Sequence, residues 1–286
     1  MIGKGSIRME YKIVLDSCGE LPEELKKDQR FAHVPLTLQV GEEFIIDDEN
    51  FDQAEFLRKV AAYPECPKSA CPSPDTYTDT MRGNHETYVV TLSAELSGSY
   101  NSAELGRRLF EEEDADARVH VFNSRGASVA QTQIALEVVD CKEKGMKFEQ
   151  VVEHVENFIS DMDTYFVLET LEMLRKNGRL SNVKALVASV LNIKPVMGST
   201  KEGTIQQLDQ ARGINKALHK MVEIIQKAKP DSENRRLAIS HCNCLDRALY
   251  LRDEMLKVMK FKEVLILDTA GISSLYAADG GIIVAL

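Results

Sequence analysis

A loop rich in small hydroxyl residues is the part of the sequence best suited to bind a ligand. It extends from Ser93 to Ser99 around Gly98, after the β-branched and aromatic run Tyr88–Leu92 and before the helical spacing of Tyr100–Leu109. This order predicts a buried strand, a loop and a helix. Backbone N–H groups and hydroxyls then lie together at the positive end of the helix dipole, where they can bind a carboxylate or a phosphate.

Two more predicted strands lead into loops that contain serine. Tyr11–Leu15 is followed by the sequence DSCG, and Arg118–Phe122 is followed by NSRGAS, with a helix expected after each loop. Three strand, loop and helix units predict a parallel, doubly wound sheet of the α/β class. Because ligands of such sheets bind beyond the carboxyl ends of the strands, we expect the loops that hold Ser17, Ser93 and Ser124 at one edge.

Strands and helices alternate less regularly in the second half of the chain. Ile193–Met197 and Thr204–Gln207 are predicted strands on either side of a turn, and further helices and strands follow them. This pattern favours a mixed sheet with helices packed mainly on one face. We therefore predict two α/β domains, residues 1–162 and residues 163–286.

The composition excludes several classes of protein. The chain has 286 residues and a net charge of −10, so no overall positive field is available to attract nucleic acid or an anionic membrane. It contains no apolar run of about 18 residues, as a transmembrane helix would require, and its start, MIGKGSIRMEYK, lacks the apolar middle of a signal peptide. Its six cysteines form no regular framework and indicate reduced thiols, so we expect a cytoplasmic protein.

A series of short segments occurs in an order and spacing that are together specific. The segments are DSCGELP (Asp16–Pro22), SACPSP (Ser69–Pro74), SAELSGSYNSA (Ser93–Ala103), NSRGAS (Asn123–Ser128), LRKNGRLS (Leu174–Ser181) and LNIKPVM (Leu191–Met197). In this order they resemble the DegV family of bacterial lipid-binding proteins, and the resemblance extends from Lys12 to the C-terminus.

The resemblance implies a two-domain protein that buries one long-chain fatty acid, similar to palmitate, stearate or oleate, and needs no other cofactor. The carboxylate would be held by hydroxyls of the serine loops, and the tail would occupy a tunnel between the domains. In the FakB-type branch of the family, the bound acid is presented to a FakA-type kinase, which phosphorylates the carboxyl group for phospholipid synthesis. We therefore expect a monomeric carrier and not an enzyme.

The residues expected at the head group combine hydroxyls with one backbone segment. A buried carboxylate is costly unless several donors surround it, and the donors that we assign are Ser69, Ser93, Ser97 and the backbone of Gly98. Arg179 in the segment NGRLS is expected to face a partner or a phosphate near the tunnel mouth.

The sequence departs from the family pattern in the loops that would hold the head group. The family's T-S-Q is Ser69-Ala70-Cys71 here, Ala94 replaces the second serine of S-S-x-L, and Asn123 replaces an acid. Tyr276 stands where the family's H-T-G-P-G motif has its histidine. A tyrosine hydroxyl can still donate to a carboxylate, but it does not become cationic near pH 7.

Two segments are candidates for the lining of the tunnel. Val183–Leu191 is apolar and rich in small residues, which predicts a buried helix, and Ile282–Leu286 is the closing apolar run.

Other functions remain open for the same residues. The serines could simply cap helices, and Arg179 could be a surface charge at a helix end. A serine hydrolase would use Ser97 as its nucleophile, although the sequence ELSGS differs from the G-x-S-x-G elbow. A phosphate- or nucleotide-binding module is the other alternative, although neither standard glycine-rich phosphate motif is present. His241-Cys242-Asn243-Cys244 has no second ligand pair at suitable spacing, so we expect no metal site.

Overall fold

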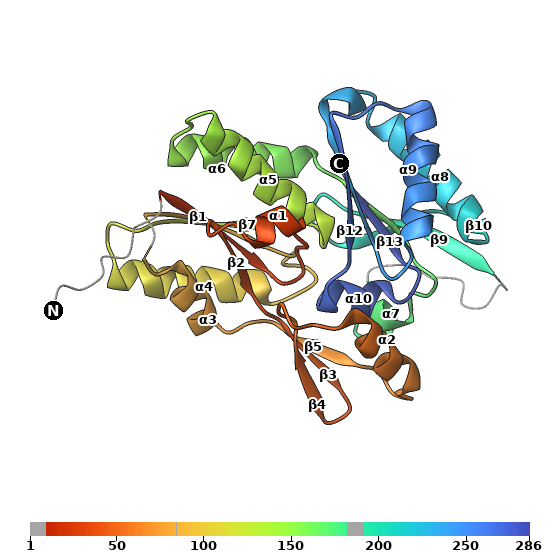
Figure 1. The fold of residues 1–286 in the computed structure, drawn as a ribbon, viewed down its shortest axis with the longest axis horizontal. Coiled ribbons are helices and arrows are strands. Elements are labelled where there is room, and N and C mark those ends of the chain that lie inside the picture. The colour runs from red at the N-terminus through yellow and green to blue at the C-terminus, as the bar shows by residue number, and fades with distance from the viewer. Residues whose placement is uncertain (1–9, 84, 182–191) are drawn as a thin grey trace.

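A parallel sheet forms the first half of the computed structural model, which describes residues 10–83, 85–181 and 192–286 (Figure 1). Its strands lie in the order β2-β1-β6-β7 and all neighbours are parallel. Helices cover both faces, which confirms the doubly wound arrangement. The strands are β1 (Tyr11–Asp16), β2 (Phe31–Val34), β6 (Glu86–Thr91) and β7 (Arg118–Asn123), and the helices are α3 (Pro74–Met81), α4 (Ser99–Glu113), α5 (Val129–Glu143) and α6 (Phe148–Asp161).

A six-stranded mixed sheet forms the second half, in the order β10-β9-β8-β13-β11-β12. Only the β11–β12 pair is parallel among its neighbours. Helices α8 and α9 cover one face, as predicted, and α5 packs against the other face through Ala238 and Ala285. The elements are β8 (Thr164–Val167), β9 (Ile193–Ser199), β10 (Ile205–Arg212), β11 (Arg236–His241), β12 (Glu263–Asp268), β13 (Ile282–Ala285), α8 (Ile214–Ala228) and α9 (Leu245–Val258).

A small antiparallel sheet projects from the body beside helix α2 (Gln53–Ala62) (Figure 1). It consists of β4 (Glu43–Ile46), β3 (Thr37–Val40) and β5 (Lys68–Ala70), in that order. The extended run of residues 31–40 divides around Pro35 between two sheets, with β2 in the parallel sheet and β3 here. The proline-rich segment 64–74 contains β5, whose three residues pair with β3.

Three short helices and one 3₁₀ turn complete the described fold: α1 (Glu23–Lys26), α7 (Glu172–Lys176), α10 (Gly271–Ala277) and Ser232–Asn234. The sequence analysis did not anticipate α10. The helix predicted over Val183–Leu191 lies outside the described residues. All strands of the six-stranded sheet follow α6 in the chain, beginning with β8. The division into domains between residues 162 and 163 stays a prediction, because α5 packs on both sheets.

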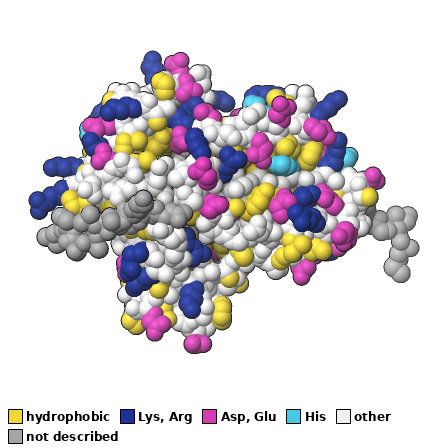
Figure 2. Space-filling model, turned by 180° about the vertical axis from the view of Figure 1, so that it is seen from behind, with side chains coloured by type: hydrophobic (Ala, Val, Ile, Leu, Met, Phe, Trp, Pro, Cys, Tyr) yellow, Lys and Arg dark blue, Asp and Glu magenta, His cyan; other side chains and the backbone are white. Residues whose placement is uncertain are grey.

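The surface carries charges of both signs. Figure 2 shows lysine and arginine side chains interspersed with aspartate and glutamate on the face that it presents. In the described part of the chain, none of the helices is long and apolar enough to cross a membrane.

The three serine loops lie at the same edge of the parallel sheet, as the strand order predicts. Their backbones are joined by hydrogen bonds from Ser124 N to Thr91 O at 3.2 Å and from Ser93 N to Gly126 O at 2.8 Å. Ser17 N donates to Val34 O at 3.0 Å at the same ends of β1 and β2. The edge is therefore a connected layer of loops.

Asp16, at the end of β1, connects the loops of this layer through hydrogen bonds to its side chain. Its fully buried carboxylate accepts hydrogen bonds from Leu92 N at 2.9 Å, Cys18 N at 3.2 Å, Ser99 Oγ at 2.6 Å and Gln131 Nε2 at 2.8 Å. Burial raises the pKa of Asp16, and these four donors oppose that shift.

Two more buried carboxyl groups join the loop layer to α10. Asp47 accepts from the backbone N–H groups of Gly271 at 2.7 Å and Ile272 at 2.8 Å. Glu20 accepts from Ser128 Oγ at 2.7 Å and from Ala270 N at 3.4 Å. Burial raises the pKa of Asp47 to about 6 and that of Glu20 to about 7.

Glu20→Gln is expected to reduce the loss of stability with rising pH. The pKa of Glu20 is about 7 in the folded chain and 4.5 for an ordinary glutamate, so the folded state keeps a proton that the unfolded state has lost. The stability that protonation of Glu20 gives the folded state is fully present below pH 4.5 and is lost as the pH rises through 7. The total fall in unfolding free energy from this group is about 3 kcal/mol. Urea denaturation at pH 5 and pH 8.5 should therefore show a smaller fall in unfolding free energy for the variant than for the parent.

Glu24→Gln is the matched control, because Glu24 is an exposed glutamate on α1. This variant should lose as much stability between the two pH values as the parent. If Glu20→Gln behaves in the same way, Glu20 is already ionised in the folded chain.

Candidate functional site

A cavity of about 750 Å³, part of it open to solvent, lies between the loop layer and the mixed sheet. Period-two alternation along β8 and β13 places Phe166 and Ile283 on the sheet face opposite α8 and α9. Both side chains line the cavity. The other large apolar lining residues come from both halves of the chain: Leu92, Leu96, Leu168, Leu174, Ile205 and Ile272. Walls that are mostly apolar and carry a few polar side chains are typical of sites that enclose small organic ligands.

The cavity follows β8 lengthwise. Thr164, Phe166 and Leu168 all line it, and four residues of extended chain span about 13 Å. Helix α7, which begins shortly after Leu168, packs on α10. This packing puts Tyr276 of α10 near the Leu168 end. The lining therefore suits an extended and mostly apolar ligand, with Tyr276 as a polar side chain near one end. Arg125, Ser199 and Thr204 are further polar residues of the lining.

Tyr276 and Ser69 form a pair of hydroxyls at this end. Their oxygen atoms are 3.0 Å apart, and either can be the donor. Ser69 belongs to β5 of the small sheet, so the pair joins residues that are 207 positions apart. Ser69 is not itself among the cavity-lining residues, so its assignment as a carboxylate donor stays a prediction. Burial raises the pKa of Tyr276 above its ordinary value of 10.0, so the hydroxyl stays protonated near neutral pH.

Arg179 supplies a positive charge beside the hydroxyl pair. Its guanidinium carbon lies 5.4 Å from the centre of the Tyr276 ring, a favourable cation–π distance. The side chain is held in place because Nε donates to Leu96 O at 3.1 Å and Nη1 donates to Asn177 O at 2.6 Å. Arg179 and Tyr276 both line the cavity, so the structure brings these two predicted residues together.

Ser93 has a different environment from the one that we expected. It is fully buried, its hydroxyl donates to Gly203 O at 2.8 Å, and it is not among the cavity-lining residues. The hydroxyl therefore holds the turn between β9 and β10 against the loop layer. To donate to a ligand it would have to give up the Gly203 carbonyl, so its assignment as a carboxylate donor stays a prediction.

Ser97 and Gly98 lie at the start of α4. Ser97 Oγ accepts a hydrogen bond from Ser99 N at 3.2 Å, but the N-cap residue of α4 is Gly98, and no side chain caps this helix. Ser97 is not among the cavity-lining residues, so its assignment as a carboxylate donor stays a prediction. A Cβ atom at Gly98 would lie 3.1 Å from Cys71 Sγ, tighter than most such contacts. Glycine is thus favoured there by close packing, while its contact with a ligand stays a prediction.

The hydrolase alternative receives no support from this geometry. Across residues 10–83, 85–181 and 192–286, Ser97 is hydrogen-bonded to no histidine, and a serine nucleophile needs such a base.

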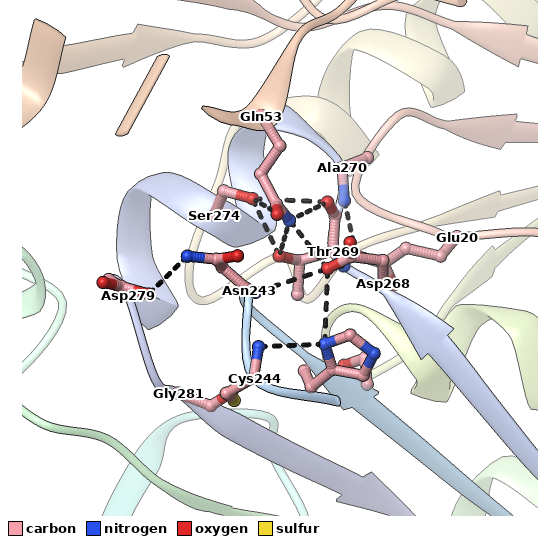
Figure 3. Close-up of polar contacts among 12 residues, drawn as sticks. Glu20, Gln53, Asn243, Cys244, Asp268, Thr269, Ala270, Ser274, Asp279 and Gly281 are labelled. Atoms are coloured by element: carbon pink, nitrogen blue, oxygen red, sulfur yellow. Dashed lines mark hydrogen bonds and ion pairs between the residues drawn. The ribbon is translucent and has the colours of Figure 1, made fainter. Parts of the chain in front are cut away.

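A polar network fixes the segment that leads into α10 (Figure 3). Gln53 Nε2, at the start of α2, donates to Asp268 Oδ1 and Thr269 O, both at 2.8 Å, and lies 3.2 Å from Ser274 Oγ. Thr269 Oγ1 and Ser274 Oγ are 2.7 Å apart. The sequence analysis missed this network, as it missed Asp16, Glu20 and Asp47. For Asp16 a signal was present, because the acid directly follows a predicted strand.

The His241–Cys244 segment forms a turn that contacts this network. His241 Nδ1 accepts from Cys244 N at 3.3 Å and lies 3.4 Å from Asp268 Oδ1. Cys244 Sγ points to Gly281 O at 3.5 Å. These contacts give the segment a structural role.

Comparisons with known proteins agree with the architecture. Residues 10–285 match the family model described as "Uncharacterised protein, DegV family". A DegV domain-containing protein of Streptococcus gordonii is 33% identical over 277 residues, which cover 96% of this chain and 98% of that protein.

Solved structures agree over almost the full chain. A DegV family protein of Ruminococcus gnavus, refined with vaccenic acid, is 50% identical with a TM-score of 0.95, over 98% of this chain and 100% of that one. The Streptococcus pneumoniae Fatty Acid Kinase (Fak) B3 protein, loaded with linoleic acid, is 31% identical with a TM-score of 0.87, over 97% and 99%. The matches confirm the resemblance found in the sequence motifs: the chain belongs to the DegV family.

Proposed function

We propose that this protein binds one long-chain fatty acid, with the tail in the cavity and the carboxylate at the Tyr276 end. The observation that carries the proposal is the cavity itself, which has apolar walls from both halves and a hydroxyl pair beside a guanidinium at one end. The Ruminococcus gnavus relative refined with vaccenic acid supports the same ligand class.

The two parts of such a ligand have different needs, and the cavity meets both. Burial of the alkyl tail against side chains such as Leu92, Phe166 and Ile283 is favourable by about 25 cal/mol per Å² of apolar surface. The carboxylate needs donors, which Tyr276 and Ser69 supply. In the free protein these hydroxyls satisfy each other, so ligand binding replaces one hydrogen bond by two charge-assisted ones.

We further propose that the protein is a carrier that hands its ligand to a FakA-type kinase in phospholipid synthesis, working as a monomer in the cytoplasm. The relative described as a Fatty Acid Kinase B3 protein supports the kinase partner. Arg179 then has a second role, since phosphorylation of the carboxyl group adds negative charge close to the guanidinium.

Mass spectrometry of the purified protein tests the ligand directly. Native and solvent-extracted samples should show a single fatty acid near one per chain, and delipidated protein should take up added palmitate or oleate. A clean apo mass without uptake would overturn the proposal. Thermal stabilisation by nucleotides or phosphosugars would then favour the phosphate-binding alternative.

Removal of the Tyr276 hydroxyl is expected to weaken fatty-acid binding. Tyr276→Phe deletes one hydrogen bond to a charged group, which corresponds to about 1.5–3 kcal/mol of binding free energy. The same change combined with Ser69→Ala should weaken binding further. Calorimetric titration of delipidated protein with oleate measures both effects.

The matched control is Tyr250→Phe, because Tyr250 is exposed on α9 and distant from the cavity. Its affinity for oleate should equal that of the parent. If Tyr276→Phe also binds oleate with the parent's affinity, the carboxylate lies elsewhere in the cavity.

Arg179→Gln is expected to slow transfer to the kinase even when the variant is fully loaded with fatty acid. With each protein loaded to one fatty acid per chain, acyl-phosphate formation by a FakA-type kinase should fall by about tenfold or more, because a charged group near the reacting atoms is lost. Arg175→Gln is the control, since Arg175 is exposed on α7 and pairs with Glu172. Equal rates for all three proteins would show that Arg179 faces neither the kinase nor the phosphate.

A further inference from the structure

A group of three different metal-ligating side chains lies on helices α5 and α6. Glu137 and Cys141 are four residues apart on α5 and therefore share one face of that helix. His154 comes from α6. The ligand atoms of all three lie within 4.8 Å of one another, and they form the one such group among the residues that the structure describes.

The site is separate from the fatty-acid cavity. Helix α5 begins next to Ser128, which lines the cavity. Glu137 is nine residues further along, which corresponds to about 14 Å of helix. Figure 1 shows α5 and α6 side by side, and both pack on the same face of the first sheet.

The three side chains differ in their exposure to solvent, and the difference would let an ion enter from solvent. Cys141 is fully buried at the base, within the core cluster that α5 and α6 share. The side chain of Glu137 is 16% exposed and that of His154 is 42% exposed. An ion would thus be held by a buried sulfur and reached through two side chains that can still rotate.

The chemistry of the ligands selects a borderline-soft ion. Thiolate, imidazole and carboxylate bind zinc at about 2.3, 2.0–2.1 and 2.0–2.2 Å. Magnesium and calcium prefer oxygen ligands alone. Three protein ligands leave a fourth tetrahedral position for water.

The contact between Glu137 and His154 shows how the ion would fit. His154 Nε2 lies 2.7 Å from Glu137 Oε1, so these two ligand atoms already face each other. A zinc ion bound by both would take the imidazole through Nε2 as the tautomer that carries its proton on Nδ1, and binding of the Cys141 sulfur as thiolate would release the thiol proton to solvent. Rotation of the two partly exposed side chains would open the pair enough to admit the ion.

We propose that Glu137, Cys141 and His154 form a zinc site that fastens α6 to α5. Because α5 packs on both large sheets, an ion at this place would stabilise the helix that joins the two halves of the protein. The site does not depend on the proposed fatty-acid function.

A second histidine–glutamate pair provides an internal control. His120 Nε2 lies 3.0 Å from Glu156 Oε1, and this pair is not part of the metal-ligating group. An ordinary surface ion pair should behave like this one. The difference between the two pairs isolates the contribution of Cys141.

Titration of untagged, full-length protein with Co²⁺ and Zn²⁺ tests the site. We expect one Co²⁺ per chain with a thiolate-to-cobalt charge-transfer band, displaced by Zn²⁺. Cys141→Ser should abolish the band, and Glu137→Gln and His154→Gln should each weaken Zn²⁺ binding by roughly tenfold or more. His120→Gln should leave both the band and the affinity unchanged.

Thermal unfolding gives a second readout that tolerates destabilised variants. Zn²⁺ should raise the melting temperature of the parent and of His120→Gln, and EDTA should reverse the rise. Absence of a thiolate band in the parent would overturn the proposal. A band that persists in Cys141→Ser, or equal effects of His120→Gln and His154→Gln, would do the same.

Discussion

The buried carboxylate of Asp16 is the interaction on which the rest of the site depends. An uncompensated charge at this depth would be strongly unfavourable, so its four donors are obligatory partners. They come from the loop after β1, the loop after β6, the start of α4 and the first turns of α5. One side chain thereby sets the relative positions of the loops that form one wall of the cavity. Loss of this carboxylate would release several loops together.

The other walls of the cavity are attached to this layer by polar contacts that cross the chain. Asp47 binds the first N–H groups of α10, which is also where the helix dipole favours a negative charge. Ser93 holds the β9–β10 turn through Gly203. These contacts allow an apolar interior between two sheets, because they satisfy polar groups that surround it. Thr164 Oγ1, which belongs to a lining residue, is a buried oxygen without a hydrogen-bond partner in the described part of the chain.

Local patterns were sufficient to predict the first sheet and insufficient for the parts built from distant segments. The β-branched runs before serine loops identified β1, β6 and β7, since β1 and β6 are buried on both faces and each of the three strands is followed by a polar loop. Strand β5 has only three residues in a proline-rich segment, and its pairing with β3 depends on tertiary context. Helix α10 has seven residues, and its first backbone N–H group, that of Gly271, donates to Asp47, which lies 224 positions away in the sequence. No local signal therefore marks the start of this helix.

The candidate site was predictable in its residues and less so in their contacts. Tyr276 and Arg179 were both selected from the sequence, and both line the cavity. Their mutual contact and the contact with Ser69 could not be derived, because three separate segments meet there. The position of Ser93 after a strand predicted a hydroxyl that is free to bind a ligand. In the folded chain this hydroxyl donates to the carbonyl of Gly203, 110 residues away.

The pairing of Tyr276 with Arg179 gives a physical account of how this chain can do without the histidine of the family pattern. A histidine can donate a hydrogen bond and, when protonated, can also attract a carboxylate by charge. Tyr276 keeps only the first of these properties, and burial, which raises its pKa, keeps its proton in place. Arg179 lies against the same ring and supplies a positive charge beside it. In the proposed site, donor and cation are thus divided between two residues.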